Sequence, residues 1–394
     1  MSAFHTPSDE RSVSEAVRAA KAAGLPLEIS GGTSRAGLGC PVQAEATLST
    51  RGLDGIELYE PGALCLVVKA GTPLKTVEEV LGAENQRLPF EPMDHRALFG
   101  APDAEPTIGG IVACGVSGPR RIQAGACRDS LIGVRFVNGS GEVVKNGGRV
   151  MKNVTGYDLV KLMCGSYGTL GVLTELSFKL VPQPEDEATI CVAGLGDATA
   201  VEALSAALAS PFDVSGAAHV PGDADGDSTR TLIRVEGFAA SVAYRADRLR
   251  ELLGAFGESA IMGADDSRAI WRAVRDCEFF CASDRAVWRI SVRPSHGPEV
   301  VASLKDAVDA AAYYDWGGGL VWLAVADEGD AGAAAIRAAT ARFGGHATLV
   351  RAASATRLRV DVFEPEPAAI AGLTRGIKSS FDPAGILNPG RMGH

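Results

Sequence analysis

Apolar residues recur at helical spacing near the start of the chain, with a stripe of valines and alanines inside residues 6–23. Residues three and four apart share one face of a helix, so the spacing predicts a helix there, ended by Gly24. A short strand at 25–29 leads directly into a glycine-rich stretch. The uninterrupted apolar run at 65–70 predicts a buried strand, and the spacing at 74–81 predicts an amphipathic helix. This early alternation indicates mixed helix and sheet.

The pattern then changes to strands joined by short turns. Residues 131–137 (LIGVRFV) predict a strand, 138–141 (NGSG) a turn and 142–145 (EVVK) a second strand, which together form a hairpin. A short helix over 157–164 follows. Residues 170–181 alternate as a long strand that ends at a proline.

A domain boundary is predicted at 181–188 (VPQPEDEA), where two prolines and three acids interrupt the pattern. Beyond it, alanine-rich helices alternate with strands, which predicts an α+β domain with helices over an antiparallel sheet. We interpret residues 376–394 as ordered loop. The predicted helices of the second domain are 199–209, 241–256, 300–312 and 330–343, and its predicted strands are 190–194, 231–236, 287–293 and 320–325.

The bulk composition describes an ordinary globular protein, with 394 residues, 46% hydrophobic and 22% charged. The net charge of -10 argues against a nucleic-acid partner and against adsorption to anionic lipid. No run approaches the ~20 apolar residues of a spanning helix, and the first residues lack the features of a signal peptide. We therefore expect a cytoplasmic protein without a direct transmembrane segment, whose membrane association, if any, comes through partners.

The eight cysteines are scattered, mostly among apolar neighbours, and are expected to be free core residues. Cys277 and Cys281 alone lie close together in sequence. One such pair lacks the four thiolates that an iron–sulfur cluster needs. The chain is therefore not expected to carry its own cluster.

Glycine is concentrated between Thr107 and Gly171, where 14 of 65 residues are glycine, roughly three times the average usage of about 7%. Glycine allows either a positive φ in turns or a close approach of the backbone to a ligand, in which N–H groups converge on an anion. The stretch SGGTSRAGLG at 30–39 adds hydroxyl donors. A loop-rich β-domain would explain either stretch alone, but it explains both together poorly.

Basic residues outnumber acids between residues 107 and 157, seven against two, inside an acidic chain. This island suits a bound diphosphate, although Arg120 and Arg121 fit a solvated surface pair equally well. The chain has neither a P-loop motif nor a Rossmann fingerprint, so the nucleotide cradle has to be of another kind. The basic residues of the island are Arg120, Arg121, Arg128, Arg135, Lys145, Arg149 and Lys152.

Four stretches in this order resemble the FAD-binding domain of the vanillyl-alcohol oxidase type: SGGTSRAGLG (30–39), TIGGIVACGVSGPRR (107–121), the hairpin segment, and KNVTGYDLVKLMCGSYGTLGVLTELSFKLVP (152–182). FDPAGILNPGRM (381–392) resembles the tail with which such enzymes return to the flavin. The resemblance implies an α+β fold of three parts. These are a two-lobed PCMH-type FAD-binding domain at 1–183, an α+β cap domain with antiparallel sheet at 184–375, and a returning tail at 376–394.

The resemblance also implies roles for particular residues. One group would hold the pyrophosphate, a second would line the diphosphate and flavin ring, and a third would complete the nucleotide pocket, with Asn388 near the flavin. Thr33 stands where members with covalent flavin carry a histidine, so non-covalent FAD is expected. The three groups are Ser30, Gly31, Gly32, Thr33 and Ser34; Thr107, Gly109, Gly110, Gly115 and Ser117; and Thr155, Gly156, Gly171 and Val172.

The substrate motifs of the family's hydroxy-acid dehydrogenases, H-G-D-G-N and a later E-H-G, are absent, and the chain has six histidines in all. An FAD cradle without a histidine site resembles the E-subunit family of glycolate oxidase. This resemblance implies an FAD-binding subunit of a complex that oxidises glycolate, a small 2-hydroxy acid, to glyoxylate. The implied partners are a homologous catalytic FAD subunit and an iron–sulfur subunit that passes electrons to quinone. The alternatives are a stand-alone FAD-dependent 2-hydroxy-acid dehydrogenase and a non-catalytic structural subunit.

A few other side chains have a functional and a structural interpretation. His346 is a candidate substrate ligand, but a lone histidine at a strand edge is more often structural. Arg289 and Arg293 can clamp a carboxylate or form surface ion pairs. The four tryptophans suit a core or interface better than a redox wire. Tyr157 and Asp158 can lie against the flavin, although Asp158 is explained as a helix cap.

Overall fold

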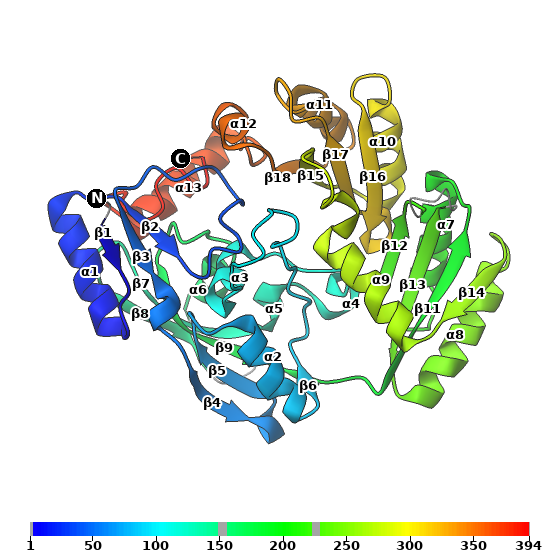
Figure 1. Cartoon of the computed structure of the whole chain (residues 1–394), viewed down its shortest axis with the longest axis horizontal. Coiled ribbons are helices and arrows are strands. Elements are labelled where there is room, and N and C mark those ends of the chain that lie inside the picture. The colour runs from blue at the N-terminus through cyan, green and yellow to red at the C-terminus, as the bar shows by residue number, and fades with distance from the viewer. Residues whose placement is uncertain (1–2, 149–155, 223–228, 394) are drawn as a thin grey trace. The chain divides into compact units, whose positions relative to one another are not determined.

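The computed structural model describes residues 3–148, 156–222 and 229–393. The chain divides into two compact units (Figure 1), each described here by itself. Unit 1 comprises Met1–Ser117, Gly125–Gln183 and Pro365–His394, and unit 2 comprises Gly118–Ala124 and Pro184–Glu364.

The first lobe of unit 1 is a three-stranded parallel sheet in the order β1-β3-β2, packed against helix α1. Helix α1 begins after Asp9, whose side chain accepts the Ser12 N–H at 2.7 Å, and ends at Gly24 with φ 61°. Its apolar stripe is buried against the sheet, with Val13 and Val17 fully covered. The elements are β1 (Ala3–His5), α1 (Glu10–Ala23), β2 (Leu27–Ser30) and β3 (Ala46–Ser49).

The second lobe is a five-stranded antiparallel sheet in the order β4-β5-β9-β7-β8, covered by short helices over one apolar core. The predicted hairpin corresponds to β7 and β8, and the long alternating strand to β9. The elements are β4 (Ile56–Glu60), β5 (Cys65–Lys69), α2 (Leu74–Ala83), β6 (Gln86–Arg87), α3 (Ile108–Cys114), α5 (Cys127–Ser130), β7 (Leu131–Val137), β8 (Val143–Gly147), α6 (Leu159–Met163), β9 (Val172–Lys179) and β10 (Val181–Pro182), of which β6 and β10 pair with each other.

The carboxyl-terminal segment rejoins unit 1. Helix α13 (Ala368–Phe381) is followed by a tail that pairs with β2 through a parallel bridge between Leu27 and Leu387. The interpretation of residues 376–394 as loop is wrong for 376–381, which form the last turns of α13. Two glycines inside the helix, Gly372 and Gly376, hide it from the sequence because glycine is a poor helix former.

Unit 2 is built on an eight-stranded sheet in the order β14-β11-β13-β12-β16-β17-β15-β18, with every pairing antiparallel. Helices α7 and α8 pack on β11 and β13 around an alanine- and leucine-rich core. The strands are β11 (Asp186–Ala193), β12 (Gly216–Val220), β13 (Arg230–Gly237), β14 (Ser259–Met262), β15 (Ala286–Ser291), β16 (Ala310–Asp315), β17 (Leu320–Val325) and β18 (His346–Arg351). The helices are α4 (Arg121–Ala124), α7 (Asp197–Leu208), α8 (Ala239–Leu253), α9 (Ala264–Asp276), α10 (Gly297–Leu304), α11 (Ala333–Arg342) and α12 (Ser354–Arg359).

The predicted α+β class with an antiparallel second sheet is confirmed, but one helix was placed wrongly. The helix predicted over 300–312 ends at Leu304, and Ala310 already belongs to β16. The three alanines at 310–312 favour a helix locally, but pairing with β17 overrides that preference. Across the described ranges, no helix is long and apolar enough to cross a membrane.

Candidate cofactor site

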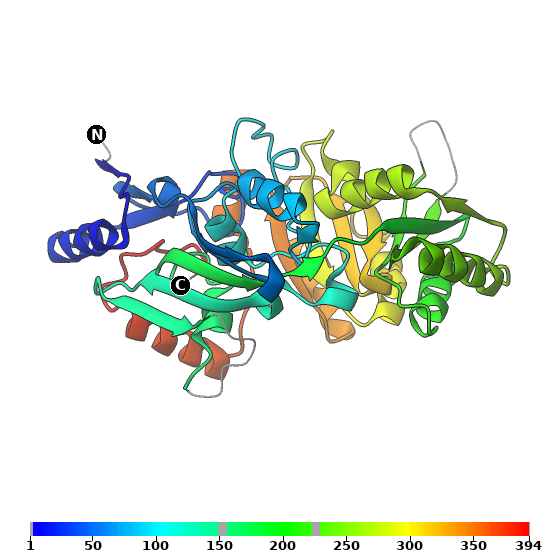
Figure 2. The same ribbon diagram turned by 90° about the horizontal axis from the view of Figure 1, so that it is seen from below.

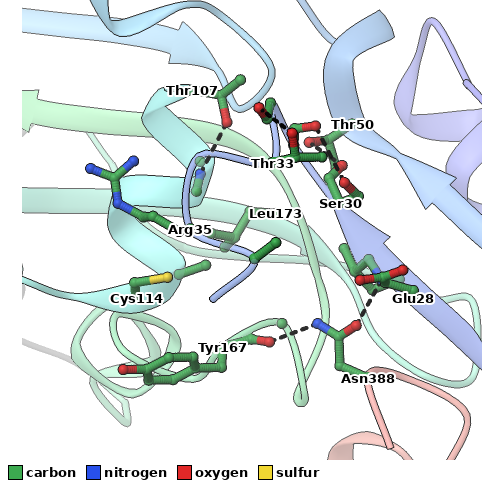
Figure 3. Close-up of a pocket in the computed structure, with 18 of the residues that line it drawn as sticks. Glu28, Ser30, Thr33, Arg35, Thr50, Thr107, Cys114, Tyr167, Leu173 and Asn388 are labelled. Carbon is green, nitrogen blue, oxygen red and sulfur yellow. Dashed lines mark hydrogen bonds between the residues drawn. The ribbon is translucent and has the colours of Figure 1, made fainter. Parts of the chain in front are cut away.

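A cavity of about 320 Å³ lies in unit 1, where the loop after β2, helix α3 and the carboxyl-terminal tail meet (Figure 3). Ten of the fifteen residues expected to bind the cofactor line it. They come from segments far apart in sequence, which the sheet and the tail bring to one place. The ten are Ser30, Gly31, Gly32, Thr33, Ser34, Thr107, Gly109, Gly110, Gly171 and Asn388.

The loop after β2 exposes backbone donors to this cavity. Within the described residues, the N–H groups of four consecutive residues, 31–34, donate to no protein acceptor. Thr33 adopts φ 62°, an uncommon left-handed conformation for a residue with a side chain. Successive N–H groups around such a turn form a concave site for an anion.

Glycine at position 32 is required by close packing of two backbones. A Cβ built there would lie 1.5 Å from the carbonyl oxygen of Glu105, whose own N–H bonds to the Gly32 carbonyl at 3.0 Å. At Gly31 a Cβ would come within 2.5 Å of the Thr107 hydroxyl. The loop is therefore pressed against the segment that leads into α3.

Helix α3 supplies a second wall. The Thr107 hydroxyl caps the helix by accepting the Gly110 N–H at 3.3 Å. The Gly109 N–H bonds to the carbonyl of Ala70 at 2.8 Å, and a Cβ at Gly109 would lie 2.5 Å from that oxygen. Gly109 thus allows α3 to lie directly on the chain segment that follows β5.

The third wall is the tail, held by Asn388. Its side-chain oxygen accepts the Ile29 N–H at 2.7 Å, and its side-chain nitrogen donates to the Tyr167 carbonyl at 2.7 Å (Figure 3). Arg391 donates to the carbonyls of Ala36 and Leu38 at 3.1 Å each. The tail therefore fixes both ends of the loop after β2.

Four of the other expected residues lie outside the cavity lining. Gly115 ends α3 with φ 64°, and Ser117 accepts the Cys127 N–H at 3.0 Å. Val172 is fully buried in the core of the first lobe, and Gly156 is exposed. Thr155 lies outside the described residues.

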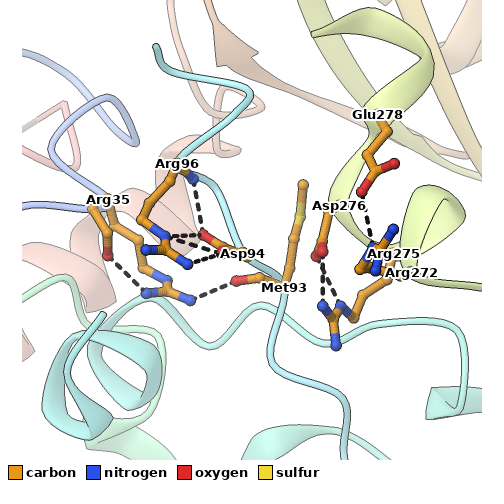
Figure 4. Close-up of polar contacts among 9 residues, drawn as sticks. Arg35, Met93, Asp94, Arg96, Arg272, Arg275, Asp276 and Glu278 are labelled. Carbon is orange, nitrogen blue, oxygen red and sulfur yellow. Dashed lines mark hydrogen bonds and ion pairs between the residues drawn. The ribbon is translucent and has the colours of Figure 1, made fainter. Parts of the chain in front are cut away.

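Several lining residues were missed because their role depends on contacts that no local pattern records. Arg35 is buried, donates to the Met93 carbonyl at 2.6 Å and to the Ser34 hydroxyl at 3.1 Å, and lies beside an ion pair of Asp94 with Arg96 (Figure 4). The signals that could have found them are the arginines inside SGGTSRAGLG and NPGRM. The missed residues are Glu28, Ile29, Arg35, Ala36, Leu38, Thr47, Thr50, Ala70, Ala113, Cys114, Tyr167, Gly168, Leu173 and Arg391.

Charge in the cavity comes from Arg35, Arg391 and Glu28. Glu28 lies 3.4 Å from Arg391 in an ion pair. Burial raises the pKa of the Cys114 thiol to about 11, and the two arginines act in the opposite direction. Cys114 therefore stays protonated at neutral pH, and the cavity wall is cationic on balance.

The basic island does not line this cavity in its described part. Arg120 instead forms two bonds to Glu236, at 2.9 and 3.0 Å, inside unit 2. Arg121 lies over the ring of Trp316 at 4.6 Å, and Arg135 pairs with Glu10. Arg149 and Lys152 lie outside the described residues.

The remaining candidates have structural explanations. Asp158 caps α6 by accepting the Lys161 N–H at 3.1 Å, while Tyr157 is 88% exposed. Arg293 lies beyond the end of β15, so it does not share a strand face with Arg289. His346 is exposed at the start of the edge strand β18.

The tryptophans are mainly core residues: Trp271, Trp288 and Trp322 are buried. Trp316 is half-buried between the guanidinium groups of Arg121 and Arg289, which lie 4.6 and 5.1 Å from the ring centre. No group of three or more His, Cys, Asp or Glu side chains in the described part of the chain is placed to hold a metal ion.

Comparison with known proteins decides the family. Residues 1–147 match the family model described as FAD binding domain. The chain is 35% identical over 371 residues to the glycolate oxidase subunit GlcE of Escherichia coli (strain K12), which covers 93% of this chain and 92% of that protein. The chain belongs to the GlcE family of FAD-dependent oxidoreductase subunits. The predicted family and the predicted cofactor, FAD, are thereby confirmed.

This GlcE-family chain is also similar to a second glycolate oxidase subunit and to solved structures. It is 30% identical over 208 residues to the glycolate oxidase subunit GlcD of Bacillus subtilis (strain 168), covering 53% of this chain and 41% of that one. Among solved structures, p-cresol methylhydroxylase with substrate bound superposes with a TM-score of 0.71 at 18% identity, covering 99% of this chain and 88% of that one. At that identity the likeness shows the fold alone, and it agrees with the predicted two-lobed FAD-binding architecture.

Proposed function

We propose that this chain is the FAD-holding subunit of a glycolate oxidase complex that converts glycolate to glyoxylate. FAD would be bound without a covalent link, because Thr33 offers no nitrogen for attachment to the flavin. The observation that carries the proposal is the cavity itself, whose donors suit a diphosphate and whose described lining contains no histidine and one carboxylate, Glu28, which is paired with Arg391.

The donors at the loop after β2 fit the anionic part of FAD. The backbone N–H groups of 31–34, together with the Ser30 and Ser34 hydroxyls, would hold the diphosphate, and the Arg35 charge favours it. Thr107, Gly109 and Gly110 would lie along the diphosphate and the flavin, Gly171 would complete the nucleotide pocket, and Asn388 would lie near the flavin. Bound FAD supplies the hydride and electron chemistry of such oxidoreductases.

The absence of a base in the cavity argues for a division of labour. Among its described lining residues there is no histidine, and Glu28 is the one carboxylate, engaged by Arg391. A general base must lie within hydrogen-bond reach of the proton it removes. We therefore infer that glycolate is oxidised at the homologous catalytic subunit and that an iron–sulfur subunit carries electrons towards quinone. Contact of this cytoplasmic chain with the membrane would come through those partners.

The test is the spectrum and activity of the purified chain, alone and co-expressed with a GlcD-type subunit and an iron–sulfur subunit. The chain alone should show flavin absorption that is released by denaturation, and little glycolate-dependent dye reduction. Addition of the partners should restore turnover. Robust turnover by the chain alone would instead support a stand-alone dehydrogenase, and a flavin-free chain that still assembles would support a structural subunit.

A further inference from the structure

Three cysteines lie at the ends of three short helices of unit 1. Helices α3, α5 and α6 pack against β7 and β9 around one apolar core (Figure 1 and Figure 2). Cys114 is the last residue of α3, Cys127 is the first residue of α5, and Cys164 follows the last residue of α6. The fold therefore gathers thiols that are far apart along the chain.

The end of α6 is held against α3. The N–H of Gly165 donates to the carbonyl of Val112 at 2.9 Å. A Cβ built on Gly115 would lie 3.6 Å from the sulfur of Cys164. The Cys164 thiol thus lies beside the residue that follows Cys114, and Cys114 itself lines the cofactor cavity.

The thiols of Cys127 and Cys164 are joined by a hydrogen bond. Cys127 is fully buried, and its N–H donates to the Ser117 hydroxyl at 3.0 Å, which fixes the start of α5. Cys164 is partly exposed. The pair therefore consists of one thiol that a small solute can reach and a second that is covered and in contact with the first.

The two thiols differ in protonation. The hydrogen bond from Cys127 lowers the pKa of Cys164 in spite of burial; Arg128 acts in the same direction as the bond, and Asp129 opposes it. Burial raises the pKa of Cys127. The thiolate is the nucleophilic form of cysteine. The accessible thiol is thus the reactive one, and the covered thiol keeps its proton.

The two cysteines that are close in sequence, Cys277 and Cys281, lack this arrangement. The Cys281 thiol donates to the Cys277 carbonyl at 3.4 Å, and the Cys277 sulfur accepts the Tyr313 hydroxyl at 3.0 Å. Burial raises the pKa of both thiols. Both stay protonated at neutral pH, so Cys281 offers a matched control for Cys164.

We propose that Cys164 and Cys127 form an oxidisable dithiol beside the cofactor cavity, which hydrogen peroxide converts to a disulfide. A nucleophilic, accessible cysteine next to a second thiol is the arrangement of peroxide-sensitive cysteines. No step uses the flavin, so this inference does not depend on the proposed function.

The reaction has two steps. The Cys164 thiolate attacks one oxygen of the peroxide, the O–O bond breaks, and hydroxide leaves, which gives a sulfenic acid on Cys164. The Cys127 sulfur then attacks the Cys164 sulfur, and the sulfenic oxygen leaves as water with the Cys127 proton. Solvent protonates the hydroxide. The two sulfurs together lose two electrons, and the peroxide is reduced to two waters.

Peptide mapping of the purified chain, before and after treatment with hydrogen peroxide at neutral pH, tests the proposal. We expect the treated wild-type chain to contain a peptide linked through Cys127 and Cys164, which dithiothreitol separates. Cys164→Ser should form no such link and should lose thiols more slowly by about tenfold or more. Cys127→Ser should stop at a sulfenic acid on Cys164, which dimedone traps. Cys281→Ser should behave as the wild type.

Several outcomes would overturn the inference. One is a wild-type chain that gives no linked peptide, and another is a link that contains Cys114 or Cys281 in place of Cys164. Equal rates of thiol loss in Cys164→Ser and the wild type would also count against it. The wild-type map decides the matter even if a variant fails to fold. The flavin content of the same samples bears on the proposed function separately.

Discussion

The side-chain oxygen of Asn388 accepts the backbone N–H of Ile29 at 2.7 Å, although the two residues are 359 positions apart. The same side chain donates to the carbonyl of Tyr167. One carboxamide therefore joins the tail, the strand before the glycine-rich loop and the turn before β9, and so completes the cavity.

Removal of this carboxamide is expected to weaken FAD binding. Asn388→Ala loses two hydrogen bonds of roughly 1 kcal/mol each, which corresponds to about a tenfold to hundredfold rise in the FAD dissociation constant. Asn388→Gly separates the loss of these hydrogen bonds from backbone strain, because glycine adopts the observed φ of 42° without strain. Equal losses assign the effect to the side-chain bonds. The measurement is flavin titration of the apoprotein, and unchanged affinity in both variants would contradict the expectation.

The close approach of two backbones at Gly32 predicts that one added methyl group severely reduces flavin binding. Gly32→Ala forces the loop away from the Glu105 carbonyl, so the variant should be isolated with little flavin. Gly82→Ala is the matched control, since its Cβ meets nothing and it lies inside α2. The control should gain up to about 1 kcal/mol of stability. Flavin absorbance per chain and the thermal midpoint distinguish the two; normal flavin loading in Gly32→Ala would refute the steric argument.

A pH-dependent stability is expected from Glu10. Burial opposes its ionisation, but bonds from Arg135 and Thr174 outweigh burial and hold the pKa of Glu10 below its ordinary value of 4.5. A depressed folded pKa stabilises the protein above pH 4.5 and loses that contribution as pH falls through the folded pKa. Glu10→Gln should cost about 1–3 kcal/mol at pH 7 and less below pH 4.

Urea unfolding at both pH values measures this difference. Glu15→Gln on the same helix is the control, because Glu15 pairs with Arg11 in solvent, where such pairs contribute about 0–1 kcal/mol. A Glu10→Gln penalty that grows as the solution is acidified would be incompatible with the sign of the shift.

The buried charges of unit 2 predict that removing the carboxylate of Glu236 destabilises the protein more than removing one of its arginine partners. Glu236 bonds to Arg120 and lies 3.5 Å from Arg234. Glu236→Gln leaves two buried guanidinium groups without this carboxylate and should cost about 3–5 kcal/mol. Arg120→Gln should cost less, because Arg234 still faces Glu236. Urea midpoints of the two variants give the order, and the reverse order would contradict this account.

Local patterns predicted several elements whose apolar side faces their own core, but not all of them: helix α9, with Ile270, Trp271 and Val274 buried, was not predicted. The stripe around Val13 and the strand at 131–137 are buried where the pattern put them. Helix α13 was not predicted, because its large apolar side chains are exposed and two glycines interrupt it. Strand β16 escaped detection because its alanines prefer helix until β17 pairs with them.

The candidate site shows a similar limit. The glycine-rich loops were visible in the sequence, because such a concentration of glycine indicates that the backbone turns sharply or approaches a ligand closely. The partners of the charged groups were not visible in the sequence. Arg120 bonds to Glu236, which is 116 residues away, and Arg35 donates to the carbonyl of Met93. Such pairings depend on how distant segments pack, so a cluster of arginines in sequence did not reveal which of them reach the cavity.

Unit 1 is assembled from three separate stretches of the chain, and its last stretch carries the Asn388 wall. During synthesis, the glycine-rich loop leaves the ribosome some 350 residues before its closing partner. Unit 2 is made in between. The nascent chain should therefore hold flavin poorly until its tail has left the ribosome, so insertion of the cofactor becomes a late step of maturation.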